Sequence, residues 1–351
     1  MKITAAVIQG EVQSSPDATL ARSADLAREA RAKGARMMVF PETWLPGYPA
    51  WVDVCRDAAL WNWGPSNQAY MDLVAGSVVV GSGTLFHGLQ EIARENEAVV
   101  VCGVTERVDE GKGRGTLYNA LLTFGPDGAL LNHHRKLVPT FSERLVWGPG
   151  DTAGLHAVDT PVGRIGGLVC WEHWMPLARY ALHESGEDIH VAVWPSVHEM
   201  HGVASRAHAF EGRCYVLAAG QLMKASLLPK ELEPHPAKVK SPDDWVLNGG
   251  SCIIAPSGKY VVEPVFGREA VLVAELDLDE CRLSGFTRDV TGHYQRPDAF
   301  QFAVGASDRR IVGSSDRRVV GSSDRRLERL TDQPTNRPTD EPTNDHRQPR
   351  H

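Results

Sequence analysis

The chain of 351 residues lacks the features that mark several large classes of protein. Its six cysteines are scattered without paired spacing, a usage typical of a reducing compartment and not of a disulfide framework. No stretch reaches the roughly 18 consecutive apolar residues of a membrane span. The first ten residues read as a strand and lack the apolar core of a signal peptide. We therefore expect a cytoplasmic protein that makes no membrane contact.

Charge and histidine patterns exclude further classes. The net charge is −7 with both signs mixed, so no large basic field is present to bind nucleic acid. The fourteen histidines lack matched carboxylates or cysteines at ligand spacing, although His198 and His201 would share one helix face. The Gly-x-Ser-x-Gly elbow of Ser-His-Asp hydrolases is absent. We expect no metal and no cofactor.

What the chain does contain is an alternation of strand-like and helix-like segments, which predicts a layered α/β fold. Turns of Gly-Pro-Asp-Gly at 125–128 and Ala-Pro-Ser-Gly at 255–258 predict hairpins, so the sheets should be mixed and not purely parallel. Strands are predicted at 3–9, 37–40, 99–105, 117–124, 129–132, 164–169, 191–194, 215–219, 251–255 and 270–275. Helices are predicted at 18–33, 83–97, 176–185 and 204–213.

The composition changes after residue 305. Residues 306–351 carry an eight-residue Ser-Asp-Arg-Arg repeat followed by spaced Pro-Thr pairs, with few apolar residues and many charges. Such a segment buries too little surface to offset the entropy of ordering. We predict a globular domain over 1–305 and a disordered, dispensable tail over 306–351. A second interpretation has the Ile-Val and Val-Val pairs of the repeat joining a sheet edge of a neighbouring subunit.

The most informative segment is the apolar run 165–169, which ends in Cys170. A polar and aromatic turn follows, and Pro176 stands where a helix would begin. A thiol at the end of a strand, facing a loop, is placed for nucleophilic chemistry. The alternative is a buried core thiol, because free cysteine is among the most buried residue types.

Two other strand ends carry ionisable groups. Glu42 follows a short apolar strand among aromatic residues, where poor solvation would raise its pKa and suit it to proton transfer. The alternative is a carboxylate that caps a turn. Lys136 lies in a basic cluster after the hairpin at 125–128. Its ammonium would stabilise developing negative charge, and Glu143 would orient it by an ion pair. The alternative is a solvated basic loop.

Together these segments resemble the nitrilases of the carbon–nitrogen hydrolase superfamily, and the resemblance covers about residues 3–300. The motifs occur in the order Phe-Pro-Glu-Thr-Trp (40–44), His-Arg-Lys-Leu-Val-Pro-Thr (134–140), Glu-Arg-Leu-Val-Trp-Gly-Pro-Gly-Asp (143–151) and Cys-Trp-Glu-His-Trp-Met-Pro (170–176). The resemblance implies an α-β-β-α sandwich with two mixed sheets and outer helices.

The resemblance also implies an activity and its residues. Cys170, Glu42 and Lys136 would form the catalytic set, with Glu143 as a second carboxylate beside the lysine. An organic nitrile and water would be the substrates, and the products would be a carboxylic acid and ammonia. The reaction would pass through a covalent thioimidate and thioester without a cofactor. The family resemblance further implies a homo-oligomer, a dimer extending to a spiral or filament.

An apolar pocket is expected around these groups, and His173 bears on its substrate. Many nitrilases carry Asn at this position and cyanide-processing members often carry His, which keeps hydrogen cyanide open, whereas the residues at 174–176 favour organic nitriles. Ordinary core packing is the alternative for each aromatic residue. The predicted substrate-binding residues are Tyr48, Trp147, Trp171, His173 and Trp194.

Two rival functions stay open. An amide or N-carbamoyl hydrolase of the same fold would keep the nucleophile, although Trp171 directly after the cysteine is rare in those branches. A catalytically silent assembly protein would keep only the scaffold.

Overall fold

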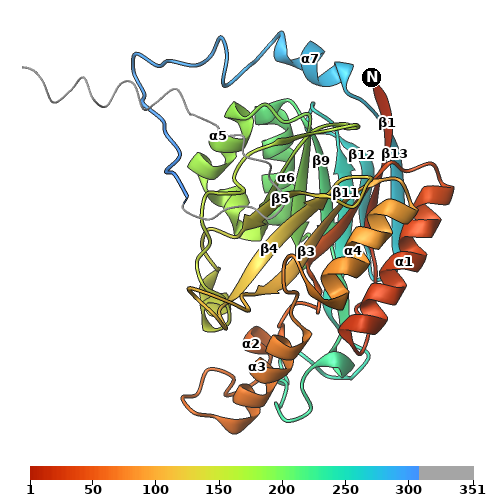
Figure 1. The fold of residues 1–351 in the computed structure, drawn as a ribbon, viewed down its shortest axis with the longest axis vertical. Helices are drawn as coiled ribbons and strands as arrows, with labels where there is room; N and C mark the ends of the chain where they lie inside the picture. Colours follow the sequence, from red (N-terminus) through yellow and green to blue (C-terminus); the bar gives the residue numbers. More distant parts are fainter. Residues whose placement is uncertain (308–351) are drawn as a thin grey trace, which may run out of the picture. The chain divides into compact units, whose positions relative to one another are not determined.

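The computed structural model describes residues 1–307 and forms two mixed β-sheets packed face to face, with helices on their outer sides (Figure 1). This is the α-β-β-α sandwich that the family resemblance implies. The tail prediction falls on residues 308–351, which lie outside the described residues. None of the helices in the described part of the chain is long and apolar enough to cross a membrane.

The first sheet has six strands. They are β1 (Lys2–Gln9), β2 (Met37–Leu45), β3 (Val99–Arg107), β4 (Leu117–Phe124), β5 (Leu130–Arg135) and β13 (Ala270–Asp277). Their spatial order is β13-β1-β2-β3-β4-β5, with parallel pairing only from β1 to β3. The predicted hairpin at 125–128 joins β4 to β5, and Gly128 takes a positive φ of 78° in it.

The second sheet has seven strands. They are β6 (Val158–Thr160), β7 (Gly163–Val169), β8 (Ile189–Trp194), β9 (Tyr215–Gly220), β10 (Leu222–Lys224), β11 (Trp245–Ile254) and β12 (Tyr260–Phe266). Six follow the order β10-β11-β9-β8-β7-β6, and β12 pairs with β11 through the second predicted hairpin. Strands β7, β8 and β9 are parallel, as short helical crossovers require.

Four of the helices match the predicted ones, namely α1 (Pro16–Ala32), α4 (Gly83–Glu95), α5 (Pro176–Glu184) and α6 (Glu199–Gly212). Helix α1 begins at a proline after an N-cap, Ser15, whose side chain accepts from the backbone of Ala18. Sequence patterns missed the remaining helices. Most of them are too short to show a periodicity, whereas α3 has 13 residues but little apolar patterning, since its buried residues are only Ser66, Ala69 and Leu73. The missed helices are α2 (Trp51–Val54), α3 (Gly64–Gly76) and α7 (Asp279–Gly285), and the 3₁₀-helices η1 (Phe141–Leu145), η2 (Cys170–Trp174) and η3 (Ala225–Leu227).

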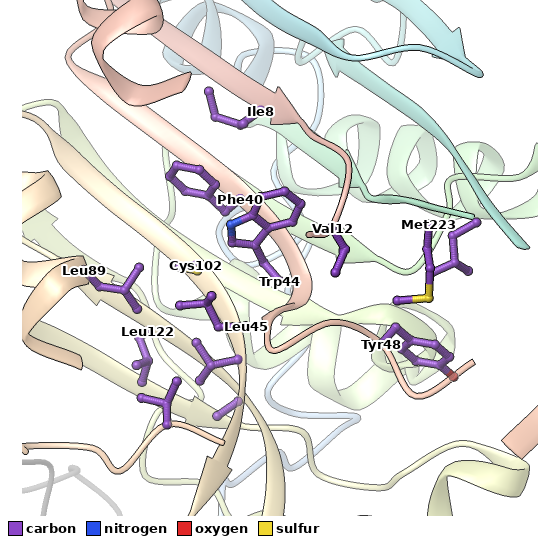
Figure 2. Packing of buried hydrophobic residues seen from close by; sticks show 14 of the residues in the cluster. Ile8, Val12, Phe40, Trp44, Leu45, Tyr48, Leu89, Cys102, Leu122 and Met223 are labelled. Atoms are coloured by element: carbon purple, nitrogen blue, oxygen red, sulfur yellow. The ribbon is translucent and has the colours of Figure 1, made fainter. Parts of the chain in front are cut away.

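The core has two layers because strand residues alternate between sheet faces. Ala6 and Met38 pack with the residues of α1 and α4, while Val7 and Val39 pack into the layer between the sheets. Strand β2 is buried along its whole length, since both of its faces are covered. Figure 2 shows the outer layer, in which Phe40 and Trp44 lie together with Ile8 on one side and Leu89 on the other.

A bulge re-aims Glu42, which lies within β2 and not after the strand as predicted. Pairing with β3 is regular up to Phe40, opposite Cys102, and resumes only at Leu45, opposite Val104. The intervening residues arch over Gly103, where an added Cβ would lie 2.6 Å from the Glu42 Cα. Glycine at 103 therefore lets the β2 backbone fold onto its neighbour, and bulges of this kind re-aim side chains beside functional sites.

We predict that Gly103→Ala lowers the free energy of unfolding by about 1–3 kcal/mol, because its methyl group overlaps the backbone that carries Glu42. Thermal and urea denaturation would measure the change. Gly64→Ala, where a Cβ meets nothing within 4 Å, is the control and should stay within about 0.5 kcal/mol of the parent protein. Equal stability of the two variants would contradict this account of the bulge.

Candidate active site

Glu42 lies at the bulge in a fully buried setting. Its Oε1 accepts hydrogen bonds from Asn119 Nδ2 at 2.6 Å and Lys136 Nζ at 3.2 Å. Its backbone carbonyl accepts from Gln221 Nε2 at 2.6 Å, which fixes the arch of the bulge against the second sheet. The other carboxylate oxygen, Oε2, is buried and has no hydrogen-bond partner within residues 1–307. That oxygen is free to exchange a proton.

Lys136 follows the end of β5, and its side chain is completely buried. Besides Glu42, its ammonium donates to Glu143 Oε2 at 2.6 Å. Glu143 is itself held in η1, where it accepts from the backbone N–H of Thr140 at 2.7 Å and from the Tyr48 hydroxyl at 3.0 Å. The expected ion pair with Glu143 is thus present, and the alternative of a solvated basic loop does not hold at this lysine.

Cys170 stands where β7 gives way to η2 and is 4 % exposed. Its φ of 53° lies in the left-handed region, which costs a non-glycine residue about 1–3 kcal/mol and recurs at functional turns. Its sulfur and one carboxylate oxygen from each of Glu42 and Glu143 lie within 4.8 Å of one another. Three segments far apart in sequence therefore meet in one buried cluster.

Burial and the neighbouring charges set the protonation of this cluster. Burial raises the pKa of Glu42 to about 7, with Lys136 opposing the rise and Glu143 adding to it. Burial likewise raises the pKa of the Cys170 thiol well above its usual range. For Lys136 burial acts to lower the pKa, but the surrounding acidic groups outweigh it and raise the pKa. The resting cluster is a neutral thiol, an ammonium and a carboxyl group poised near neutrality.

The cluster has metal-ligating residue types but an unsuitable charge pattern for a cation. Glu42, Glu143 and Cys170 offer ligand atoms in reach of one ion. The Lys136 ammonium, however, is paired with both carboxylates and supplies the positive charge at their centre. A divalent cation would have to displace that ammonium, so the arrangement favours acid–base and nucleophilic chemistry.

Glu172 joins the elements that carry these groups. Its buried carboxylate accepts from the backbone N–H groups of Val169 and Leu137, both at 2.7 Å, and from His134 Nε2 at 2.9 Å. Burial raises its pKa, but His134 and the backbone donors outweigh that effect and lower it, so the group stays ionised. One carboxylate thus ties the end of β7, which leads into the cysteine, to the segment that carries the lysine.

The predicted pocket residues occupy three different settings. Tyr48 and Trp147 pack edge to face, 5.8 Å between ring centroids, beside Glu143. Trp171 is half exposed on the surface. His173 and Trp194 are fully buried and stacked 4.7 Å apart, and the His173 ring also contacts His190 and His208.

Sequence patterns missed Asn119 and Gln221, the two residues that hold Glu42. Asn119 lies within a regular strand and Gln221 between two strands, outside every motif. No local signal distinguishes them from other polar strand residues, since their partners come from 77 and 179 positions away in the chain.

An α-β-β-α sandwich with a buried glutamate, lysine and cysteine defines a class of hydrolases that use a thiol. Comparison with known proteins agrees. The model of the carbon–nitrogen hydrolase family matches residues 4–285. An aliphatic nitrilase from Sinorhizobium fredii is 36% identical over 89% of this chain and 98% of its own length. A nitrilase from Paraburkholderia phymatum is 37% identical over 82% of both chains, and Nitrilase 3 from Arabidopsis thaliana is 34% identical over 86% of both.

Solved structures show the same fold at lower identity. A carbon–nitrogen hydrolase from Helicobacter pylori superposes with a TM-score of 0.65 at 20% identity, over 85% of this chain and 97% of that one. A superfamily member from Xanthomonas campestris gives 0.63 at 20% identity, over 87% and 100%. The chain belongs to the carbon–nitrogen hydrolase family and, within it, to the nitrilases. The predicted family, fold and enzyme class are thereby confirmed.

We predict that Glu172→Gln lowers the free energy of unfolding by about 2–4 kcal/mol, because an amide cannot accept all of the buried N–H groups that face the carboxylate. Denaturation midpoints would measure the loss. Glu184→Gln, an exposed position on α5, is the matched control and should change stability by less than about 0.5 kcal/mol. A Glu172→Gln protein as stable as this control would remove the bridging role.

Proposed function

We propose that this protein hydrolyses an organic nitrile to the carboxylic acid and ammonia, with Cys170 as nucleophile, Glu42 as general acid and base, and Lys136 as electrostatic stabiliser. The supporting observation is the free, buried Glu42 Oε2 in the cluster that holds the Cys170 sulfur and the Lys136 ammonium. The nitrilase relatives are what favour a nitrile as the substrate.

The first half-reaction makes a thioimidate. The Cys170 sulfur attacks the nitrile carbon while its proton passes to Glu42 and from there to the nitrile nitrogen. Because burial keeps the thiol neutral at rest, this proton transfer accompanies attack and does not precede it. The Lys136 ammonium and the backbone N–H of Trp171 stabilise the negative charge that develops, and one such donor is typically worth about 3–4 kcal/mol.

Two water molecules complete the reaction. Glu42 takes a proton from the first, whose oxygen adds to the thioimidate carbon, and returns a proton to nitrogen so that ammonia leaves and a thioester remains. The second water, activated by the same carboxylate, cleaves the C–S bond and releases the acid and the thiol. Expulsion of the thiol from the first tetrahedral intermediate would instead release an amide. Glu143 keeps the ammonium oriented throughout by its 2.6 Å contact.

Recognition of the substrate is proposed to use the residues around this cluster. The contacts of Tyr48 and Trp147 place them beside Glu143, which supports a role as apolar walls. Trp171 supplies its backbone N–H, while its exposed side chain is available to a long substrate or to a second subunit. For His173 and Trp194 the contacts support a role behind the nucleophile turn.

The protein is further proposed to assemble as a homo-oligomer, a dimer that extends to a spiral or filament. Exposed apolar side chains on the neighbouring helices α5 and α6, Leu177, Met200 and Val203, support an interface there. The six cysteines are all unpaired, which supports the cytoplasm as the compartment. The chemistry itself uses only residues of the proposed 1–305 catalytic domain.

Replacing the nucleophile is the direct test. Cys170→Ala should reduce ammonia release from nitriles about 10⁴-fold or more while the thermal midpoint stays near that of the parent protein. Cys55→Ala is the matched control and should keep activity within about twofold. Aliphatic, arylaliphatic and aromatic nitriles, cyanide and the matching amides and N-carbamoyl compounds would be assayed together. Turnover of amides alone would establish the rival hydrolase, and no turnover of any compound would establish the silent scaffold.

The pH profile tests the base. Because Glu42 must be ionised to accept a proton, kcat/KM should fall as the pH drops through about 7, by about tenfold per unit below it. The apparent value belongs to the coupled cluster. An acid limb below about pH 5 would argue against a desolvated glutamate base.

Glu143→Gln supplies the matched variant for this profile. The Glu143 charge raises the pKa of Glu42, so its removal should move the acid limb to lower pH. A limb that stays in place would show that another group controls it.

A further inference from the structure

A second cluster of ionisable groups lies behind the nucleophile turn. Glu187 Oε1 lies within hydrogen-bond distance of His208 Nε2 and 3.6 Å from His183 Nδ1. One ligand atom from each of these three residues lies within 4.8 Å of the others, and all three residues are buried. Neither ring nitrogen of His183 has a hydrogen-bond partner within residues 1–307, and His208 Nδ1 has none either.

A cavity gives access to this cluster. It has a volume of about 230 Å³ and lies between the ends of α5 and α6 and the segment 281–291. His183, Glu187 and Glu211 line it, as do Arg213, Arg282 and Arg288. The backbone of Gly212 approaches His183 so closely that an added Cβ would lie 2.6 Å from the ring's Cε1. Glycine at 212 therefore leaves room for the His183 ring at the cavity wall.

We propose that His183, Glu187 and His208 form a divalent-metal site, best suited to Zn²⁺, that is separate from the catalytic cluster. Two imidazoles and one carboxylate with a fourth position open to water are a recurrent zinc ligand set. Tetrahedral ligands about 2.1 Å from zinc lie about 3.4 Å apart, close to the 3.6 Å between His183 and Glu187. The shorter contact of His208 with Glu187 would open to that length on binding.

The groups around the three ligands suit this role. The second oxygen of Glu187 accepts from His190 Nδ1 at 2.8 Å, which orients the carboxylate. The far nitrogen of His183 faces Glu211 Oε2 at 3.9 Å, and Arg179 holds that carboxylate at 3.0 Å. A carboxylate behind a ligating imidazole is a common outer-shell arrangement.

Metal binding requires ionised carboxylates and neutral imidazoles, and two of the three proposed ligands are in these forms. Burial lowers the pKa of His208 to about 3. Burial would raise the pKa of Glu187, but His190 and His208 outweigh it and hold that pKa well below its usual range. For the third, burial acts to lower the pKa of His183, but Glu187 and Glu211 outweigh it and raise the pKa, so the metal would displace a proton from this ring.

The test is direct metal binding by the full chain without a histidine tag. The protein is stripped with a chelator and dialysed against Zn²⁺, and the bound metal is counted by elemental analysis. Visible absorption of the Co²⁺ form reports the ligand geometry. The parent protein should bind about one equivalent with a raised thermal midpoint. Substoichiometric binding, or a Co²⁺ spectrum of an octahedral aquo ion, would overturn the proposal.

Four variants assign the site. Cys170→Ala should keep the metal, because the catalytic cluster is not the proposed ligand set. His87→Asn, an exposed histidine on α4, should also keep it. His183→Asn and the longer His183→Gln should weaken binding about 100-fold while leaving nitrile turnover unchanged. Binding that survives both His183 variants, or that is lost only in Cys170→Ala, would overturn the proposal, whatever the outcome for nitrile hydrolysis.

Discussion

The site depends on one buried ammonium held between two carboxylates. Moving Lys136 and its partners out of water costs several kcal/mol per ion, and their mutual attraction must recover that cost. With two carboxylates and one ammonium, negative charge is in excess whenever both acids are ionised. Asn119 and Lys136 share one oxygen of Glu42 and leave the other without a partner. The contacts of Glu42 therefore do not fully offset the cost of burying its charge, and its pKa rises to about 7.

The sandwich fold makes this arrangement stable enough to persist. Glu42 lies on a bulge of a strand that is covered on both faces, and the left-handed turn at Cys170 follows a strand whose last five residues are buried. Glu172 then fixes that turn to the lysine segment by three hydrogen bonds. Strain and buried charge both lower stability, so they concentrate where rigid strands on either side determine the geometry.

The sequence was sufficient for the family, the layered fold and the meeting of Cys170, Glu42, Lys136 and Glu143, because each of these residues belongs to a recognisable motif. The sequence did not identify the residues that hydrogen-bond to Glu42. Asn119 can be recognised as one of them only when the sheet brings together strands that are distant in the chain. The setting of the pocket aromatics likewise follows from tertiary packing, since a side chain at a turn points inward or outward according to the neighbouring helix and not to its own residue type.

His173 illustrates what packing adds. Its Nδ1 donates to the carbonyl of Cys170 at 2.7 Å, so its Nε2 must accept from His190 Nε2 at 3.0 Å. His190 also faces Glu187, with its Nδ1 2.8 Å from the Glu187 Oε2. Hydrogen-bond contacts thus connect Glu187, through His190 and His173, to the nucleophile's backbone carbonyl. Asparagine at 173, as in many nitrilases, would hold the carbonyl but fall short of His190. The histidine in this chain therefore joins the nucleophile turn to the cluster behind it, through its contacts with Cys170 and His190.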